Sequence, residues 1–216
     1  ALTCSHPGEA LPLADNSWTC ILLDPPCSGW GTLDKNPIAA KLWTPEKVQP
    51  LVSLQRALLR RACALLSPGG RLLYSTCTTN IRENEEQAAW AVAELGLEPE
   101  PLAPFAGFSF HAPRLETAAG TLCVDGAASD GQGFYLARLR KPPTATPETE
   151  LLRLDATLPG DPLPDRLLEI EGLNLSNLPP GRVYDFKGRA VFIPQAALDF
   201  MVPAGGRFRF NGLDLG

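Results

Sequence analysis

The sequence has few of the residues that build metal sites. Its 216 residues include two histidines, His6 and His111, and six cysteines, at positions 4, 20, 27, 63, 77 and 123, with no Cys-x-x-Cys pair among them. Structural zinc sites usually take ligands from such closely spaced pairs. We therefore predict no metal.

Long apolar runs are missing as well. No run approaches the ~18 residues that a membrane-spanning helix needs, and no signal-peptide pattern opens the chain. We expect no membrane contact and a cytoplasmic location, where cysteines stay reduced. The net charge of −5 does not favour a nucleic-acid partner, since such proteins usually carry a basic surface. Residues 172–216, however, hold five Lys or Arg against three Asp or Glu, so this last segment is weakly basic.

The first residues lack the strand, glycine-rich turn and helix that normally begin a doubly wound sheet. They carry turn signals instead, Pro7-Gly8 and Asp15-Asn16. We therefore expect a connecting segment at the start. The chain as a whole is expected to be part of a longer protein, truncated at both ends.

Two short apolar runs, residues 21–23 and 72–74, are each followed closely by a cysteine, Cys27 and Cys77. Runs of this length bounded by Pro and Gly are typical of strands buried on both faces of a parallel sheet. Between them, Thr44 as cap and Pro45 at the first position indicate a helix. Its expected apolar stripe is Val48, Leu51, Leu54, Leu58, Ala62 and Leu65.

Residues 67–70 end this helix, and the second strand is expected at 71–76. A strand, a crossover helix and a second strand form a right-handed unit with parallel strands. Cys27 and Cys77 are then expected at the same edge, where the carboxyl ends of parallel strands bind ligands. Cys20 and Cys63 are expected to be core residues.

Farther along, Asn80 and Glu83 have the spacing of a capping pair for a helix that runs to Leu95 and ends at Gly96. The charged side chains of its first turn are expected to be solvated; they are Arg82, Glu83, Glu85 and Glu86. Residues 121–124 and 133–139 are predicted to be closing strands that form an antiparallel pair at the edge of the sheet.

The last third of the chain begins with a proline-rich stretch. Eight prolines fall in residues 142–180, which excludes a continuous helix and indicates a linker. Residues 182–186 and 189–193 then predict a β-hairpin around Lys187-Gly188, and residues 207–210 a further strand.

The residues at the two strand ends suit one kind of chemistry. Carbon 5 of a pyrimidine is a poor nucleophile, but a thiolate that adds to carbon 6 makes an enamine, which accepts a methyl group at carbon 5. A second group must then help to remove the carbon 5 proton and expel the thiolate. Cys27, Cys77 and Asp24 at one sheet edge supply the necessary groups.

The motifs that carry these residues resemble the Sun-type RNA (cytosine-5) methyltransferases. They are Asp24-Pro25-Pro26-Cys27-Ser28-Gly29-Trp30-Gly31, Asn36-Pro37, Leu65-Leu66-Ser67-Pro68-Gly69-Gly70, Tyr74-Ser75-Thr76-Cys77-Thr78, Glu83-Asn84-Glu85 and the strand at 133–141. The resemblance covers residues 17–141 in one consistent order. It implies S-adenosylmethionine as methyl donor and RNA as substrate.

Residue by residue, the resemblance implies that Cys77 is the nucleophile and Cys27 aids elimination. It further implies that Asp24 hydrogen-bonds the cytosine edge, and that Asp24, Pro25 and Pro26 lie beside the methyl donor. The glycine-rich turn and the acidic ribose ligand of the family's donor site are absent from this sequence. The chain then carries only part of that site.

Residues 181–216 are similar to the start of the PUA-like RNA-binding domain of the family's bacterial ribosomal-RNA branch. This makes small-subunit ribosomal RNA the first expected substrate, ahead of transfer RNA. The expected architecture is α/β: the second half of a Rossmann-like methyltransferase sheet in residues 1–141, a linker at 142–180, and a small, mostly β segment at 181–216. Two other classes stay open, a non-catalytic RNA-binding fragment and a thiol redox protein.

Overall fold

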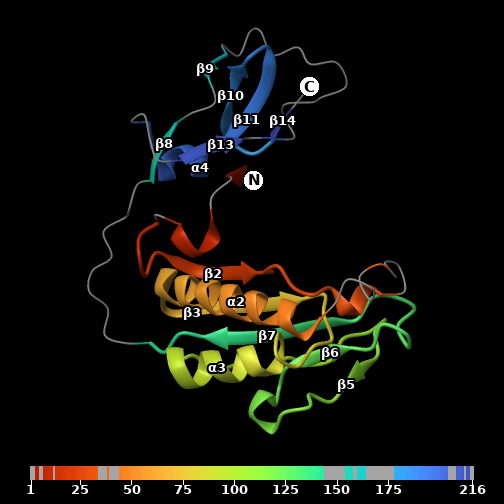
Figure 1. Ribbon diagram of the computed structural model, residues 1–216. Helices are drawn as coiled ribbons and strands as arrows, with labels where there is room; N and C mark the ends of the chain where they lie inside the picture. Colours follow the sequence, from red (N-terminus) through yellow and green to blue (C-terminus); the bar gives the residue numbers. More distant parts are fainter. Residues whose placement is uncertain are drawn as a thin grey trace. The chain divides into compact units, whose positions relative to one another are not determined.

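The computed structural model describes residues 3–4, 7–11, 13–33, 38, 44–143, 154–157, 160–163, 178–203, 208–211 and 213–214. The chain divides into two compact units. The larger is Gly8–Thr149, and the smaller combines Ala1–Pro7 with Glu150–Gly216. Figure 1 shows the elements of both units, which are taken one at a time below.

The larger unit is built on a mixed sheet with the strand order β2-β3-β7-β6-β5, with β4 also pairing with β7. The strands are β2 (Trp18–Leu23), β3 (Leu66–Thr76), β4 (Glu98–Pro99), β5 (Phe110–His111), β6 (Leu122–Val124) and β7 (Phe134–Arg140). As predicted, β2 and β3 are parallel, and β6 and β7 are antiparallel. Strand β7 also pairs antiparallel with β3 and is therefore central in the sheet. The expectation that β6 and β7 form a pair at the edge is wrong, because β7 lies between β3 and β6 and β5 extends the sheet beyond β6.

Helices α2 (Pro45–Leu65) and α3 (Glu85–Leu95) complete the larger unit, together with the short 3-10 helices η1 (Gly8–Ala10), η2 (Trp30–Thr32) and η3 (Glu116–Ala118). Helix α2 packs on β2 and β3, α3 packs on β7, and the two helices contact each other, so both cover one face of the sheet (Figure 1). Between helices and sheet lies a core that includes Leu59, Leu72, Ala91, Tyr135 and Leu139.

Helix α2 has the predicted start, with Thr44 as N-cap and Pro45 at its first position. The predicted stripe is only partly buried. Val48, Ala62 and Leu65 are buried, whereas Leu51, Leu54 and Leu58 are half-buried. The buried stripe is Val48, Val52, Gln55, Leu59, Ala62 and Leu65. Helix α2 also contacts η1 on a second side. The apolar residues that face η1 therefore have the same spacing as those that face the sheet, and spacing alone does not tell the two stripes apart.

Strand β3 begins earlier than predicted. It starts at Leu66, and residues 67–70, expected as a turn, belong to the strand. The pairing with β2 shifts register between Trp18 and Cys20, and Gly69 has a φ of 77°. A β-bulge of this kind lets a Pro-Gly-Gly sequence stay in a sheet. At this end the Lys141 ammonium donates to the carbonyls of Cys63 and Leu66, which satisfies the last carbonyls of α2.

Strand β2 is less buried than predicted. Ile21 and Leu23 pack against the core, but Cys20 is exposed and Leu22 is 68% exposed. The expectations of a strand buried on both faces and of a core Cys20 are therefore wrong. The physical reason is that β2 is the end strand of the sheet in the described residues. Cys63, by contrast, packs against the core as expected.

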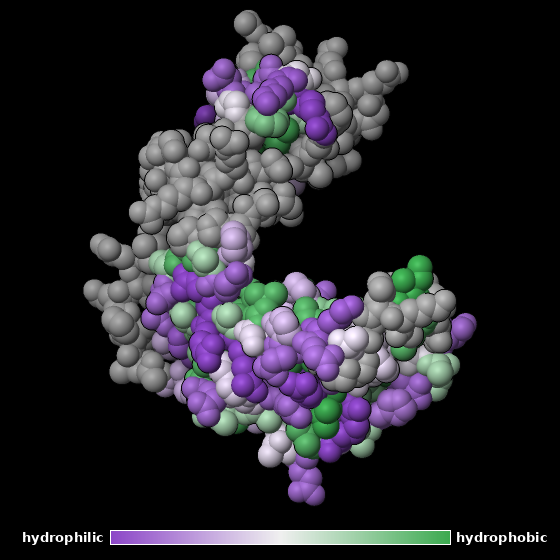
Figure 2. All heavy atoms as spheres, viewed as in Figure 1, coloured by the Kyte–Doolittle hydropathy of each residue, from purple (hydrophilic) through white to green (hydrophobic). Residues whose placement is uncertain are grey.

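The visible face of the larger unit is mostly hydrophilic, interrupted by separate apolar patches (Figure 2). The large apolar side chains that are exposed in the described residues are Leu22, Ile38, Phe105, Phe108 and Phe186. In the part of the chain that the structure describes, no helix is both long and apolar enough to cross a bilayer.

The smaller unit contains two four-stranded sheets, of order β1-β13-β8-β12 and β14-β11-β10-β9. Its elements are β1 (Thr3–Cys4), β8 (Leu154–Thr157), β9 (Asp161–Pro162), β10 (Gly181–Phe186), β11 (Arg189–Pro194), α4 (Gln195–Phe200), β12 (Met201–Pro203), β13 (Phe208–Asn211) and β14 (Leu213–Asp214). Strand β1 falls in the stretch expected to be a connecting segment, and it pairs with β13.

The predicted hairpin is present as β10 and β11. Its two turn residues, Lys187 and Gly188, have φ values of 57° and 81°. Positive φ at both positions is typical of the type I′ turn that suits the twist of a hairpin. Strand β13 confirms the predicted strand near residues 207–210.

Candidate active site

The two cysteines predicted to share a sheet edge do so. Cys27 lies in the loop that follows β2, and Cys77 follows β3 directly. Their Sγ atoms are 3.4 Å apart, although fifty residues separate them in the sequence. The parallel pairing of β2 and β3 causes this contact, because it brings the carboxyl ends of both strands to one edge.

The surroundings of the thiol pair favour the protonated form of Cys27. Burial raises the pKa of Cys27 to about 12, and its hydrogen bond with Cys77 acts in the same direction. At neutral pH, Cys27 is therefore a thiol, and its sulfur is in hydrogen-bond contact with that of Cys77.

A short chain of polar side chains joins the two cysteine loops. Ser28 Oγ donates to Glu83 Oε2 at 2.5 Å, and the Ser28 amide donates to Glu83 Oε1 at 2.9 Å. Ser28 Oγ also lies 2.8 Å from Thr78 Oγ1. Gln55 Nε2 donates to Glu83 Oε1 at 3.2 Å and to the Pro26 carbonyl at 3.0 Å. The residue after each cysteine is therefore held by its partner loop.

The segment from Asn80 to Glu85 differs from its prediction. Helix α3 begins at Glu85 with Asn84 as its N-cap, so Asn80 and Glu83 belong to the preceding turn. Glu83 and Glu85 are each 0% exposed, and the prediction that they are solvated is wrong. A count of charges cannot show that neutral donors from distant segments surround a carboxylate. The predicted end at Leu95, with Gly96 in the left-handed region, is confirmed.

Asn84 and Glu85 bind two further segments. Asn84 accepts from the Thr76 hydroxyl at 2.6 Å and donates to the Thr78 carbonyl at 2.8 Å, so it holds the backbone on both sides of Cys77. The Arg114 amide donates to Glu85 Oε1 at 3.2 Å, which ties the stretch after β5 to the start of α3.

A close backbone contact fixes Gly31 beside Cys77. The Gly31 amide donates to the Cys77 carbonyl at 2.9 Å, and the Gly133 amide donates to the Gly31 carbonyl at 3.0 Å. A Cβ atom on Gly31 would lie 2.1 Å from the Gly133 carbonyl oxygen and 2.8 Å from that of Cys77. Only glycine fits here, so the loop after β2, the loop after β3 and the start of β7 are packed backbone to backbone.

The other predicted site residues lie between the end of β2 and Cys27. Asp24 follows β2 directly and is exposed, Pro25 is buried, and Pro26 is exposed. The carboxylate of Asp24 is therefore available to a ligand. The buried Pro25 and the hydrogen-bonded Pro26 carbonyl fix the loop that carries it.

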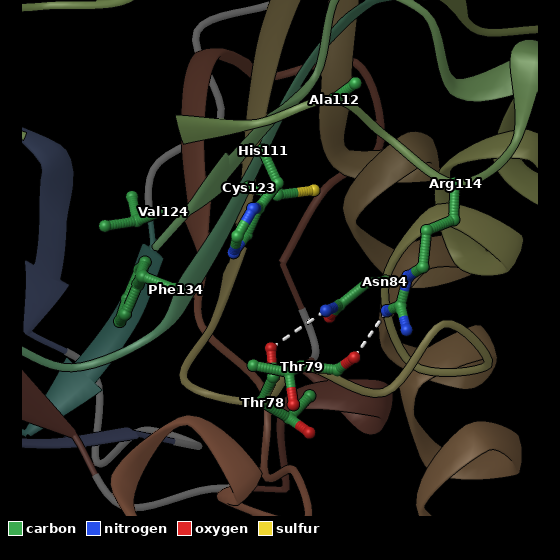
Figure 3. A pocket seen from close by; sticks show the side chains of 9 residues that line it. All are labelled: Thr78, Thr79, Asn84, His111, Ala112, Arg114, Cys123, Val124 and Phe134. Carbon is green, nitrogen blue, oxygen red and sulfur yellow. Dashed lines mark hydrogen bonds between the residues drawn. The ribbon is translucent and has the colours of Figure 1, made fainter. Parts of the chain in front are cut away.

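A cavity of about 400 Å³ opens next to the Cys77 loop (Figure 3). Its lining is Thr78, Thr79, Asn84, His111, Ala112, Arg114, Cys123, Val124 and Phe134. Arg114 donates to the Thr79 carbonyl and reaches into the cavity from the side of α3 (Figure 3). His111, which had no evident partner in the sequence, lies 3.4 Å from the Asp125 carboxylate. Burial raises the pKa of Cys123 to about 11.

This arrangement agrees with comparisons with known proteins. The family model described as "16S rRNA methyltransferase RsmB/F" matches residues 9–140. The chain belongs to this family. The match spans the whole described sheet of the larger unit, both cysteine loops and the Glu83-Asn84-Glu85 triplet.

Curated relatives in the family are similar over the same region. The chain is 40% identical over 148 residues to the ribosomal RNA small subunit methyltransferase F of Serratia proteamaculans, covering 67% of this chain and 30% of that protein. It is 42% identical over 134 residues to the protein of the same name from Salmonella heidelberg, covering 62% and 27%. The chain thus spans about 30% of the first relative's length.

One solved structure has a similar fold. The crystal structure of PH0851 superposes with a TM-score of 0.53 at 33% identity, covering 59% of this chain and 27% of that one. The Rossmann-like α/β class expected for the larger unit is therefore confirmed.

Two residues of the site were not identified from the sequence. Gln55 was not singled out by any motif, and Glu83 was expected to be solvated, although together they hold the loop of Cys27. Residues 34–37 and 39–43, which include the Asn36-Pro37 motif, lie outside the described residues. Among the residues that the structure describes, no group of His, Cys, Asp and Glu has the geometry to hold a metal ion.

The raised pKa of Cys27 predicts slow alkylation. The thiolate is the reactive form, so at pH 8 iodoacetamide is expected to modify Cys27 on the order of 100-fold more slowly than the exposed Cys20. Peptide mass spectrometry over a time course measures both rates. The rate at Cys27 should keep rising well above pH 9; equal rates for the two cysteines at pH 8 would contradict the assignment.

Proposed function

We propose that the full-length protein that carries this chain methylates carbon 5 of cytosine in small-subunit ribosomal RNA, with S-adenosylmethionine as methyl donor. The observation that carries the proposal is the contact of Cys27 and Cys77, at 3.4 Å, at the strand edge that also exposes Asp24. The family match over residues 9–140 supports the same reaction.

The first step assigns Cys77 as the nucleophile. Cys77 loses its proton, its sulfur forms a bond to carbon 6 of cytosine, and the electron pair of the carbon 5–carbon 6 double bond shifts toward carbon 4 to give an enamine. Carbon 5 then becomes nucleophilic. S-adenosylmethionine would supply the methyl group to carbon 5, and the donor sulfur would keep the electron pair of the broken sulfur–methyl bond. Asp24 hydrogen-bonds the exocyclic edge of the base and so keeps the ring in place for both bonds.

Release of the product uses Cys27. The proton on carbon 5 must leave, the double bond re-forms, and the bond between carbon 6 and Cys77 breaks, with its electron pair returning to sulfur. Cys27 carries a proton at neutral pH and lies in contact with Cys77. It gives that proton to the departing sulfur, and the strongly basic thiolate that results accepts the proton from carbon 5.

The described residues fit one side of a donor site. Asp24 presents a free carboxylate at the end of β2, and Pro25 and Pro26 set the shape of the loop. These three residues would line the donor next to the base.

We assign the smaller unit to RNA binding, with residues 181–216 as the start of a PUA-like domain. The stretch at 142–180, expected to be a linker, also contributes β8 and β9 to the sheets of this unit. Support comes from the hairpin of β10 and β11, which exposes Arg182, Lys187 and Arg189. Exposed basic side chains of this kind contact phosphates and position the protein on RNA. Because ribosomal RNA is the proposed substrate, we also propose that the protein acts in the cytoplasm.

The proposal is tested by methyl transfer from radiolabelled S-adenosylmethionine by the full-length protein, with naked 16S ribosomal RNA, assembled small subunits and transfer RNA as separate substrates. Digestion and mass spectrometry should identify 5-methylcytidine in the small-subunit RNA. Modification of transfer RNA alone would favour the transfer-RNA reading. Binding of RNA without any methylation would favour a non-catalytic role.

A further inference from the structure

Glu83 is an uncommon buried carboxylate. It is 0% exposed, yet the groups that donate to it are neutral: the Ser28 amide, the Ser28 hydroxyl and the Gln55 side-chain amide. Burying a carboxylate is costly unless hydrogen bonds satisfy its oxygens. Here Oε1 accepts two such bonds and Oε2 accepts one. The carboxylate therefore depends on the Cys27 loop for its satisfaction, and the loop depends on the carboxylate.

These contacts run in one direction. A carboxylate only accepts, so the Ser28 hydroxyl must donate its single proton to Glu83. Ser28 Oγ then accepts from Thr78 Oγ1 at 2.8 Å. Thr78 Oγ1 in turn accepts from the Asn80 amide at 3.2 Å. The resulting chain of donors leads from the Cys77 loop, across to the Cys27 loop, and ends on Glu83.

The chain runs beside the thiol pair. Ser28 follows Cys27 and Thr78 follows Cys77, so a hydroxyl contact at 2.8 Å lies one residue along from the sulfur contact at 3.4 Å. On the other side of Cys27, the Pro26 carbonyl is held by Gln55, which also contacts Glu83. Both neighbours of Cys27 are thus tied to a single carboxylate.

Glu83 itself is held firmly. The Tyr74 hydroxyl donates to its backbone carbonyl at 2.7 Å, and Tyr74 is 1% exposed in the core of the sheet. The next residue, Asn84, binds the backbone around Cys77. Glu83, which accepts from the Cys27 loop, and Asn84, which binds the backbone of the Cys77 loop, are therefore consecutive residues on one fixed turn.

We propose that Glu83 is a positioning residue that sets the distance between the sulfur atoms of Cys27 and Cys77. It does not touch the reacting atoms and acts through Ser28 and Gln55. The consequence for methyl transfer rests on the proposed function. The positioning itself does not, because it concerns only the two sulfur atoms of the free protein.

The test measures the sulfur-to-sulfur distance by chemistry that needs neither RNA nor methyl donor. The 216-residue chain is treated with dibromobimane, which alkylates two nearby thiols with loss of two bromides and two protons. Mass spectrometry gives the fraction of Cys77-labelled molecules in which Cys27 is bridged to Cys77. Glu83→Gln is expected to lower this fraction about tenfold, since the loop loses its fixed place. Glu86→Gln, the same change in the next turn, is the matched control and should leave it unchanged.

A second variant tests whether a lower bridged fraction results from lost positioning of the loop or from unfolding of the chain. Thr78→Val keeps the size of the side chain and leaves Glu83 bonded to Ser28, but removes the hydroxyl contact between Ser28 and Thr78. It should also lower the bridged fraction in a chain that still unfolds cooperatively in urea, at a lower midpoint because the Asn80 amide loses its acceptor. An unchanged fraction in folded Glu83→Gln, or no bridge in the unsubstituted chain, would overturn the proposal. In the full-length enzyme, Glu83→Gln should reduce kcat with little change in the KM for RNA. If the bridging results are as expected but the full-length protein and all its variants fail to methylate RNA, the proposed function is contradicted and the positioning role of Glu83 is not.

Discussion

Cys77→Ser is expected to abolish methyl transfer by the full-length protein, by on the order of 10⁴-fold or more, as for other enzymes that lose their nucleophile. The reason is that an alcohol is far less nucleophilic than a thiol in contact with a second thiol at 3.4 Å. The measurement is the initial rate of 5-methylcytidine formation under saturating donor and RNA.

Cys27→Ser is the matched comparison, since it changes the same atom in the partner cysteine. It should slow turnover and cause the enzyme–RNA adduct to accumulate, because formation of the bond from Cys77 to carbon 6 does not need Cys27 and its breakage does. A variant Cys27→Ser that forms no adduct, together with a Cys77→Ser that still does, would reverse the two roles.

Gly31→Ala is expected to cause the largest structural effect of any single methyl group in the larger unit. The added Cβ would lie 2.1 Å from the Gly133 carbonyl oxygen, and backbone on both sides limits relaxation. We expect the free energy of unfolding to fall by at least about 1–3 kcal/mol. The loops of Cys27 and Cys77 should also separate. Urea unfolding and the dibromobimane bridge measure the two effects.

Gly131→Ala provides the control for this substitution. A Cβ at Gly131 would meet its nearest neighbour, the Ser129 carbonyl oxygen, at 3.6 Å, which is ordinary contact. Its free energy of unfolding should stay within about 0.5 kcal/mol of the unsubstituted chain. If Gly31→Ala is as stable as Gly131→Ala, the packing described between the three segments is not present in solution.

The sequence was informative wherever a local rule decides the structure. The crossover from β2 through α2 to β3 follows from two apolar runs and a capped helix between them, and it brings Cys27 and Cys77 together by topology. The hairpin turn at Lys187-Gly188 follows from the need for positive φ. In both cases the residues that signal the structure also cause it.

The failures come from contacts between distant segments. Glu83 lies in a charged stretch of the kind found in solvated turns. Its burial depends on Ser28 and Gln55, which lie 55 and 28 residues away in the sequence. Gly31 reads as one more glycine in a loop until Gly133 and Cys77 are placed against it. Leu22 reads as a core residue, but its exposure is decided by which strands flank β2. Local sequence patterns such as helix spacing, caps and turn residues cannot predict these contacts between distant segments.

The most direct test of the account is to identify the cysteine that bonds to RNA. The full-length protein is incubated with S-adenosylmethionine and small-subunit RNA containing 5-azacytosine, which blocks the release step, and the cross-linked peptide is sequenced by mass spectrometry. The account predicts that the nucleotide is attached through Cys77 in the peptide that follows β3. Attachment through Cys27 would contradict it, and so would a stable noncovalent complex with no adduct at all.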